Sequence, residues 1–347
     1  MKLLVSALEP SSNLHLKEVL KYTREVELLG IFDKTIKEGS PLYDISELAI
    51  MGVVDALKKL HWFFKVADEM VELAKDADKV LLMDSSGFNL PLAKKLKIAY
   101  PNKEIIYYIL PQIWASRPKR VKKLEQYCDK LLGILPFEVD FYQNKAQYIG
   151  HPLLDEIRVS YHAKADTIAF MPGSRKSEIN RLLPIFKEVR KKLFNKKAIL
   201  IIPNSFSNEK IDTLYGDISE FEISRDTHTA LAQSEFAFIC SGTATLEAAL
   251  IGTPFTLSYI AKKVDFFIGK KLLGIKQVGL ANIILTNYNN TTLHKEILQE
   301  EVTVENLLKE YYDTNREVFT NKATELREYL KHGSSENVAK IIMDMSC

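Results

Sequence analysis

The feature that most constrains the fold is an alternation of short apolar runs with longer amphipathic segments. The runs end at small or polar residues, which is typical of buried strands. In the first half of the chain we expect strands over residues 3–7, 80–83, 105–110 and 130–135, and helices over 14–29 and 90–97. Strands that alternate with helices predict a parallel sheet wrapped by helices.

The same alternation begins again after Gly150-His151-Pro152. Here we expect strands over 168–171, 198–202 and 236–239, a helix over 177–194 and mainly helical structure over 302–345. A chain of 347 residues is also long for a single core. We therefore predict an α/β fold with two Rossmann-like domains facing a cleft and ligands at the carboxyl ends of the strands. The domains are expected at 1–155 and 156–347, with the terminal helices of 302–347 as candidates for packing back on the first domain.

Composition excludes several classes of protein. The chain has 47 basic and 45 acidic residues, and therefore lacks the basic excess of a nucleic-acid-binding protein. Its three cysteines are far apart, show no metal-ligand spacing, and are expected to be reduced thiols in the cytoplasm. No apolar stretch is long enough to predict a membrane span, and the run over residues 1–8 is too brief for a signal peptide.

A first candidate anion site is the turn Pro172-Gly173-Ser174-Arg175, which lies between a predicted strand and a predicted helix. Backbone N–H groups at the start of a helix attract anions, and an arginine is a bidentate phosphate donor. The structural alternative is an ordinary strand-to-helix turn with a surface arginine. The pattern alone leaves both interpretations open.

A second candidate site has the same form. Ser241, Gly242 and Thr243 follow a predicted strand and open the helix that contains Glu247. Hydroxyl groups and a helix N-terminus suit phosphate oxygens, and the Glu247 carboxylate is placed to hold ribose hydroxyls. The structural alternative is a capping arrangement in which Glu247 supports the helix end. Two anion sites in one half of the chain favour a diphosphate ligand.

Several segments together resemble the lipid-A-disaccharide synthases, which are glycosyltransferases of the two-Rossmann GT-B type. The matching segments, in chain order, are Leu48–Gly52, Asp84–Asn89, Pro111–Arg120, Leu135–Glu138, Ile149–Pro152, Met171–Glu178, Ser241–Leu250 and Gly279–Asn282. Segments in this order are far more specific than any one of them.

The resemblance implies an inverting enzyme that joins UDP-2,3-diacylglucosamine to 2,3-diacylglucosamine 1-phosphate. The products are UDP and a β-1,6-linked disaccharide of lipid A, with the acceptor in the N-terminal domain and the nucleotide sugar in the C-terminal domain. Asp84 matches the family's catalytic aspartate, and we expect it to be the general base for the acceptor 6-hydroxyl. The structural alternative is that Asp84 caps the following helix.

The resemblance also assigns supporting residues. Arg175 and the turn over 241–243 are expected to stabilise the leaving UDP. Met51 and Asn89 lie in matching segments and are candidates for substrate binding. Asn282 is expected to support the donor sugar, with a structural loop asparagine as the alternative. No D-x-D pair that would bind a metal-nucleotide complex is present, and no metal or cofactor is predicted.

The first turn departs from the family pattern. The family reads A-G-E-x-S-G-D where this chain has Ala7-Leu8-Glu9-Pro10-Ser11-Ser12-Asn13. Glu9 and Ser11 are retained and are expected to contact the acceptor. The second aspartate of the family's D-x-P-D-F-N segment is Gly87 here, which leaves Asp84 as the candidate base. The family's S-L-P-N segment is Gly279–Asn282. These changes predict a divergent member of the family.

Acylated substrates imply contact with an anionic membrane surface, at the inner face of the cytoplasmic membrane. Candidate docking segments are the aromatic and basic stretch Leu57–Lys65 and the basic cluster Arg117–Lys123. The structural alternative is that the aromatic residues are core and the lysines are solvated. A third segment, Val264–Leu273, is expected to line the acyl path or to contact a second subunit. The sequence leaves open whether the chain forms a homo-oligomer.

Two other functions remain open at this stage. The first is a GT-B enzyme acting on a soluble nucleotide sugar, such as an epimerase or a cell-wall N-acetylglucosaminyltransferase. The second is a non-catalytic nucleotide-binding scaffold at the membrane. Acylated and non-acylated donors separate the first from a lipid enzyme. Loss of turnover with retained UDP binding in Asp84→Ala excludes the second.

Overall fold

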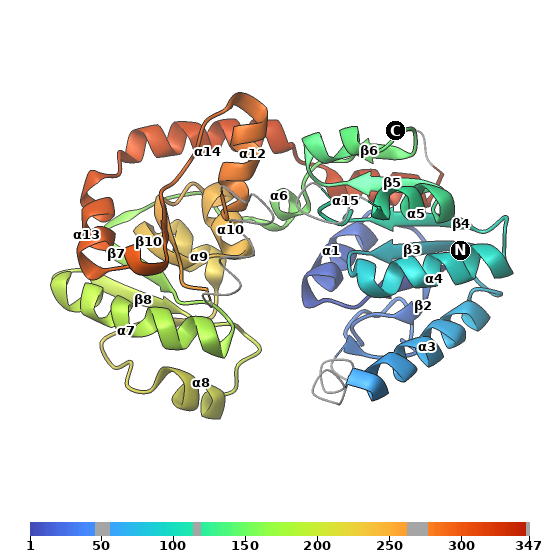
Figure 1. Cartoon of the computed structure of the whole chain (residues 1–347), viewed down its shortest axis with the longest axis horizontal. Helices are drawn as coiled ribbons and strands as arrows, with labels where there is room; N and C mark the ends of the chain where they lie inside the picture. The colour runs from blue at the N-terminus through green and yellow to red at the C-terminus, as the bar shows by residue number, and fades with distance from the viewer. Residues whose placement is uncertain (46–55, 114–118, 262–276, 345–347) are drawn as a thin grey trace. The chain divides into compact units, whose positions relative to one another are not determined.

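A computed structural model describes residues 1–45, 56–113, 119–261 and 277–344. The chain forms two compact units (Figure 1). The first unit comprises Met1–Glu156 together with Leu330–Cys347, and the second comprises Ile157–Tyr329. Each unit is built on its own parallel sheet.

The sheet of the first unit has six strands in the order β2-β1-β3-β4-β5-β6. The strands are β1 (Lys2–Ala7), β2 (Glu27–Ile31), β3 (Lys79–Met83), β4 (Glu104–Tyr108), β5 (Lys130–Gly133) and β6 (Ala146–Tyr148). All neighbouring pairs are parallel. After β2 the chain crosses to the other side of β1 to form β3. The order therefore has its switch point between β1 and β3, where ligands bind at the carboxyl ends of such sheets.

Helices cover both faces of this first sheet, because successive strand side chains point to opposite faces. One face packs against α3, α4 and α5, and the other against α1 and α15. The helices of this unit are α1 (Pro10–Leu20), α3 (Ala56–Leu73), α4 (Ser86–Ala99), α5 (Arg120–Tyr127), η1 (Pro136–Phe141), α6 (Pro152–Glu156) and α15 (Ser334–Ile342). Strand residues Leu82 and Tyr107 face the first layer, whereas Leu81 and Tyr108 face the second.

The second unit repeats the design with the strand order β12-β11-β10-β7-β8-β9. The strands are β7 (Lys164–Met171), β8 (Lys197–Ile201), β9 (Glu222–Ser224), β10 (Ser234–Cys240), β11 (Phe255–Tyr259) and β12 (Glu296–Leu298). The chain grows outward from β7 in one direction and then returns to β10 on its other side. This is the strand order of dinucleotide-binding Rossmann folds, and its switch point lies between β7 and β10.

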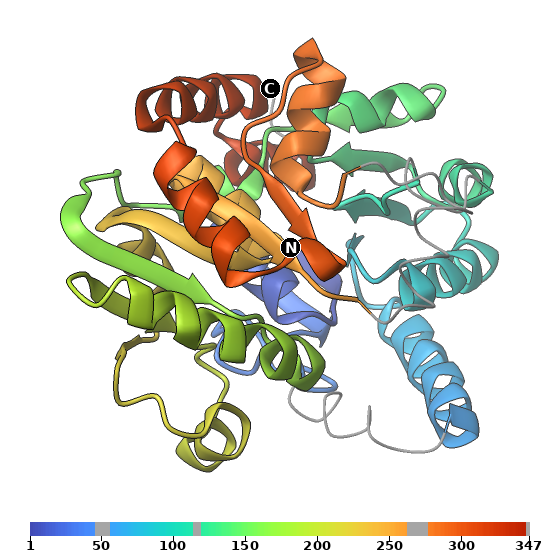
Figure 2. The same ribbon diagram turned by 60° about the vertical axis from the view of Figure 1, so that its left-hand side comes forward.

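In both ribbon views α7 and α13 lie on one face of the second sheet (Figures 1 and 2), where they share a hydrophobic core with α8. The other face carries α9, α10 and α12. The helices of this unit are α7 (Lys176–Lys192), α8 (Asn208–Tyr215), α9 (Thr227–Ala232), α10 (Thr243–Ile251), α12 (Leu280–Asn289), η3 (Gln299–Glu301), α13 (Val304–Asp313) and α14 (Arg316–Leu330).

One predicted helix is partly a strand in the structure. The helix expected over 14–29 ends at Leu20, and Glu27–Ile31 forms the strand β2. The apolar residues of this stretch also fit a helical period, and only pairing with β1 decides for a strand. The helix also begins earlier than expected, because Pro10 occupies a first-turn position where its missing N–H costs nothing. Of the helices expected over 302–345, α15 belongs to the first unit and α13 to the second.

Candidate functional site

Asp84 stands at the switch point of the first sheet, directly after β3 and beside the turn that follows β1. Its backbone has a positive φ of 48°, which is uncommon for a residue with a side chain. The Asp84 N–H donates to the Tyr108 carbonyl at 3.0 Å. Its carbonyl accepts hydrogen bonds from Asn89 Nδ2 at 3.0 Å and from the Tyr107 hydroxyl. These bonds fix the direction in which the carboxyl group leaves the sheet.

The pKa of the Asp84 carboxyl is raised above its ordinary value, and burial is the main cause. A hydrogen bond from the Ser85 backbone lowers it, the charge of Glu9 raises it, and His15 lowers it. A carboxylate with a raised pKa is a better proton acceptor, as a general base requires. The helix α4 has Ser85 in its N-cap position without a side-chain capping bond. Asp84 is therefore not the cap of that helix, contrary to the alternative in which it caps α4.

Asn89 is fully buried beneath this turn. Its Nδ2 donates to the carbonyls of Met83 and Asp84 at 2.9 and 3.0 Å, and its Oδ1 accepts from Ser6 Oγ at 2.6 Å. Both Nδ2 donors are used and the side chain is not exposed, so it presents no group to a ligand in this structure. These contacts favour support of the turn at Asp84 over direct substrate contact.

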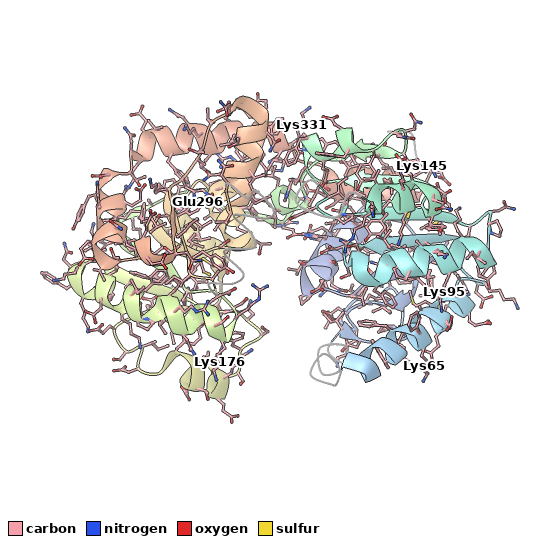
Figure 3. The ribbon with its side chains drawn as sticks, viewed as in Figure 1. Lys65, Lys95, Lys145, Lys176, Glu296 and Lys331 are labelled. Carbon is pink, nitrogen blue, oxygen red and sulfur yellow. The ribbon has the colours of Figure 1, made fainter. Side chains whose placement is uncertain are left out.

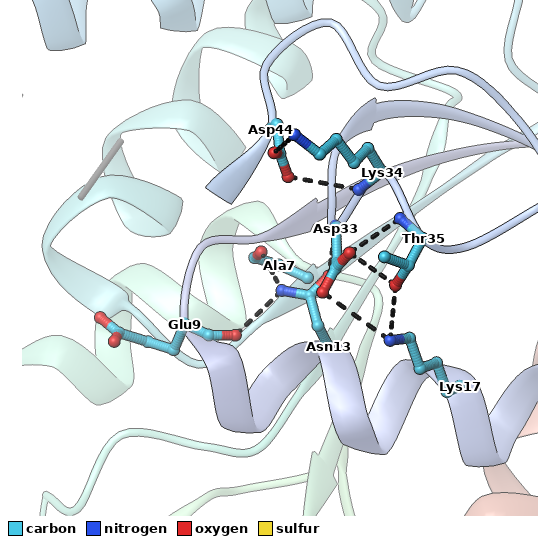
Figure 4. Close-up of polar contacts among 8 residues, drawn as sticks. All are labelled: Ala7, Glu9, Asn13, Lys17, Asp33, Lys34, Thr35 and Asp44. Carbon is cyan, nitrogen blue, oxygen red and sulfur yellow. Dashed lines mark hydrogen bonds and ion pairs between the residues drawn. The ribbon is translucent and has the colours of Figure 1, made fainter. Parts of the chain in front are cut away.

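The first turn is held by Asn13, the residue that replaces the family's aspartate (Figure 4). Its amide Nδ2 donates to the carbonyls of Ala7 and Glu9 at 2.8 and 2.9 Å. An ionised aspartate has no donor for either carbonyl. Glu9 is exposed at the N-cap position of α1, and Ser85 Oγ lies 3.4 Å from its carboxylate. Ser11 is exposed in the first turn of the same helix.

In the second unit, Gly173 has a φ of +104°, which favours glycine. A Cβ atom there would lie 2.5 Å from Glu178 Oε2. That carboxylate is buried and accepts hydrogen bonds from the N–H groups of Ser174 and Arg175, each at 3.2 Å. The backbone groups expected to bind phosphate are thus already bonded to Glu178 in this structure.

The Arg175 side chain, in contrast, is 77% exposed. One guanidinium nitrogen donates to Glu178 Oε1 at 2.8 Å, and this bond raises the arginine pKa. A guanidinium has five N–H donors, so further donors remain for an anion. Lys176, labelled in Figure 3, begins α7 directly after Arg175. The turn over residues 172–175 therefore offers an oriented cation to an anionic ligand.

The turn over residues 241–243 is open. Gly242 is the N-cap residue of α10, and the helix has no side-chain capping bond there. Gly242 and Thr243 are exposed, and a Cβ on Gly242 would meet no atom within 4 Å. Glu247 lies beside His228, with a separation of 3.7 Å between His228 Nε2 and the carboxylate. The capping alternative for this segment is therefore not what the structure shows.

The two turns lie next to each other at the switch point of the second sheet. β7 and β10 are paired in parallel, with Met171 opposite Ile239. The Cys240 sulfur lies 3.2 Å from the position of a Cβ on Gly173. The exposed arginine of one turn and the open helix N-terminus of the other therefore belong to one site. This combination suits a diphosphate.

Comparison with known proteins supports the family that the sequence motifs resemble. A family model described as lipid-A-disaccharide synthetase matches residues 3–343. The lipid-A-disaccharide synthase of Helicobacter pylori strain G27 is 50% identical over 351 residues, which cover 97% of this chain and 96% of that protein. The corresponding protein of Campylobacter jejuni strain RM1221 is 47% identical and covers 99% of both chains. The chain belongs to the lipid-A-disaccharide synthetase family.

Solved structures with low sequence identity to this chain share its fold. The calicheamicin glycosyltransferase CalG4 matches with a TM-score of 0.62 and 12% identity over 99% of this chain and 97% of that one. The Staphylococcus aureus MnaA–UDP structure matches with a TM-score of 0.63 and 12% identity, at the same coverage. The predicted α/β fold of GT-B type is confirmed, and so is the predicted family.

Asn282, in the family segment that reads S-L-P-N, is buried. Its Nδ2 donates to the His294 carbonyl and to Glu296, and its Oδ1 accepts from the N–H groups of Leu293 and His294. These bonds favour the structural alternative, in which this asparagine ties the start of α12 to the segment that contains His294. At Gly279, where the family has serine, a Cβ would lie 2.6 Å from the His294 ring.

Two residues reach the site that sequence reasoning did not assign to it. Arg120 donates from Nη1 to Ser86 Oγ at 2.7 Å, in the first turn of α4. The sequence places Arg120 in a basic cluster, which predicts membrane contact and not this bond. His15 is buried and pairs with Glu156, and its charge lowers the pKa of Asp84. No pattern in the sequence marked this histidine.

Several predicted segments lie wholly or partly outside the described residues. These are Met51 with Leu48–Gly52, Trp114–Pro118, Val264–Leu273 and the side chains over 57–61. Trp62 and Phe63 pack against the core, as the structural alternative expected, whereas Phe64 is exposed. Among the described residues, no helix is long and apolar enough to cross a membrane. Within that same part of the chain, no group of three or more His, Cys, Asp or Glu side chains is arranged to hold a metal ion.

Proposed function

We propose that this chain transfers the diacylglucosamine group of UDP-2,3-diacylglucosamine to the 6-hydroxyl of 2,3-diacylglucosamine 1-phosphate, with release of UDP. Family membership over nearly the whole chain supports this activity, because the relatives are lipid-A-disaccharide synthases. The predicted enzyme class is thereby confirmed. The residue roles below are our own assignment from the geometry of each unit.

The observation that carries the assignment is the placement of the candidate residues at the two switch points. Asp84 and Glu9 follow the paired strands β3 and β1 in the first sheet. Arg175 and Thr243 follow β7 and β10 in the second. Switch points are where sheets of this kind bind ligands. We assign the acceptor to the first unit and the nucleotide diphosphate to the second.

Asp84 is the general base in this proposal. As the acceptor oxygen attacks the anomeric carbon, its proton passes to the Asp84 carboxylate and the new C–O bond forms. The bond between the anomeric carbon and the phosphate oxygen breaks, and its electron pair leaves with UDP. Attack opposite to the leaving group inverts the anomeric centre and gives the β linkage. The raised pKa of this carboxyl supports its role.

The departing UDP gains negative charge as the bond breaks, so its stabilisation is the other part of the reaction. The exposed guanidinium of Arg175 and the uncapped start of α10 supply positive charge for it. Ser241 and Thr243 add hydroxyl donors, and Glu247 is assigned to the ribose. The chemistry proceeds through these fixed donors.

We also assign the protein to the inner face of the cytoplasmic membrane, as a peripheral protein. Both substrates carry acyl chains. Phe64 and Lys65 are exposed on α3, and Lys122 and Lys123 are exposed on α5, which packs on the same face of the first sheet. Exposed aromatic and cationic side chains suit an anionic lipid surface, where each cation contributes about 1 kcal/mol.

A coupled assay of UDP release tests the proposal. Acylated donor and acceptor should support release, whereas UDP-N-acetylglucosamine should not. The Asp84→Ala variant should lose turnover but retain UDP binding. Release from the non-acylated donor would favour the enzyme of soluble nucleotide sugars. Binding of UDP without turnover in the unaltered protein would favour the scaffold.

A further inference from the structure

The first unit contains an apolar pocket of about 470 Å³ between α3 and α4. This volume lies within the range of roughly 300–1,000 Å³ that is typical of ligand pockets. Apolar side chains dominate its lining, which consists of Leu8, Glu9, Phe63, Phe64, Ala67, Ser85, Gly87, Phe88, Pro91 and Lys95. The proposed mechanism uses none of these apolar groups.

The pocket has a packed inner wall and an open side. Phe63 and Phe88 pack with ring centroids 5.6 Å apart, and Ala67 of α3 is buried. Phe64 is 51% exposed, and Lys95 lies over its ring on the neighbouring helix. Figure 3 labels Lys95 on α4 and Lys65 on α3, the two helices that form the walls.

One edge of the pocket is the candidate site itself. Ser85 follows Asp84 in the chain, and Glu9 faces Ser85 across 3.4 Å. Both Ser85 and Glu9 belong to the pocket lining. A molecule whose hydroxyl reaches Asp84 can therefore extend an attached apolar group into the pocket without leaving the first unit.

We infer that this pocket binds one acyl chain of the acceptor, an inference that rests on the proposed function. The apolar lining excludes the sugar and the phosphate, because burying either against Phe63 and Phe88 would strip their hydrogen bonds from water. The acceptor is the substrate that must place its hydroxyl at Asp84, and the pocket opens beside that residue. The exposed Phe64 lets the chain enter from a lipid surface. The pocket sets the acyl length that the enzyme prefers.

Filling the pocket tests this inference. Gly87 lines it within α4, and a Cβ there would meet no atom within 4 Å. Gly87→Leu therefore inserts a side chain without a clash, and a leucine suits a helix better than a glycine does. Ala67→Leu fills the pocket from α3. Ala99→Leu is the matched control, because Ala99 is exposed on α4 outside this pocket.

The readout is kcat/KM for UDP release over a series of acceptors with shortened acyl chains. In the unaltered enzyme each methylene withdrawn from the pocket should lower kcat/KM by about fourfold, which corresponds to about 0.8 kcal/mol. Gly87→Leu and Ala67→Leu should lower kcat/KM roughly tenfold or more for the longest acceptor and about twofold or less for the shortest. Ala99→Leu should leave the whole series unchanged.

A direct binding measurement separates this inference from the proposed function. The chain has two tryptophans, and Trp62 lies 5.4 Å from Phe63 between ring centroids. In a Trp114→Phe background, an acceptor brominated at the end of one acyl chain should quench Trp62 fluorescence. Quenching without turnover would reject the function and keep the pocket. Turnover without quenching and without a change in length preference would reject the pocket, as would an altered preference for the donor's chain alone.

Discussion

Replacing Asn89 by alanine tests how the candidate base is positioned. The buried amide makes three hydrogen bonds, to Ser6 Oγ and to the carbonyls of Met83 and Asp84. The Ser6 hydroxyl is itself fully buried and would lose its acceptor. One unsatisfied buried hydroxyl costs about 1–3 kcal/mol, and each further bond contributes about 1 kcal/mol. We expect Asn89→Ala to destabilise the first unit by about 3–5 kcal/mol.

The assay is urea unfolding followed by tryptophan fluorescence, because residues 62 and 114, the two tryptophans, both belong to the first unit. Asn102→Ala removes an exposed asparagine from the same unit and should change stability by less than about 0.5 kcal/mol. Asn89→Ala should also lower kcat for UDP release while the affinity for UDP stays unchanged. A stability loss no greater than that of the control, or an unchanged kcat, would refute the positioning role.

Three further predictions concern the candidate base and the turns at the second switch point. The kcat/KM profile should fall at low pH as Asp84 gains its proton, with a midpoint above its ordinary pKa; because the charge of Glu9 raises that pKa, Glu9→Gln should move the midpoint to lower pH. Arg175→Ala should weaken UDP binding by about 1.5–3 kcal/mol in calorimetry, and no loss would count against the phosphate role. Gly173→Ala should lower both stability and UDP affinity, since its Cβ would displace Glu178 and its φ of +104° strains any other residue; thermal unfolding and UDP titration measure the two effects.

Local pattern was sufficient for most of the sheet strands and for the turns after them. The runs before Asp84, Gly173 and Ser241 are buried strands, because a central parallel strand is apolar on both faces. The edge strand β2 was predicted as helix, since an amphipathic stretch fits both periods and only its partner β1 decides. Strand order is likewise a property of tertiary pairing. Neither switch point could be located before the sheets were known.

The candidate site shows the same division. The chain positions of Asp84 and Arg175 followed from motifs, but the partners of the polar residues did not. Asn89 and Asn282 belong to matching segments and are buried structural residues. Sequence similarity marks a position as constrained without saying whether it contacts substrate or supports a neighbour. The carboxylate of Glu178 is a further partner that only the folded geometry reveals. It accepts hydrogen bonds from the N–H groups of Ser174 and Arg175.

The most direct test of the central claim is a crystal structure of the protein with UDP. The account predicts the diphosphate at the carboxyl ends of β7 and β10, with Arg175 bonded to a phosphate oxygen and the start of α10 facing the other phosphate. A nucleotide bound away from the turns at Gly173 and Gly242 would contradict it.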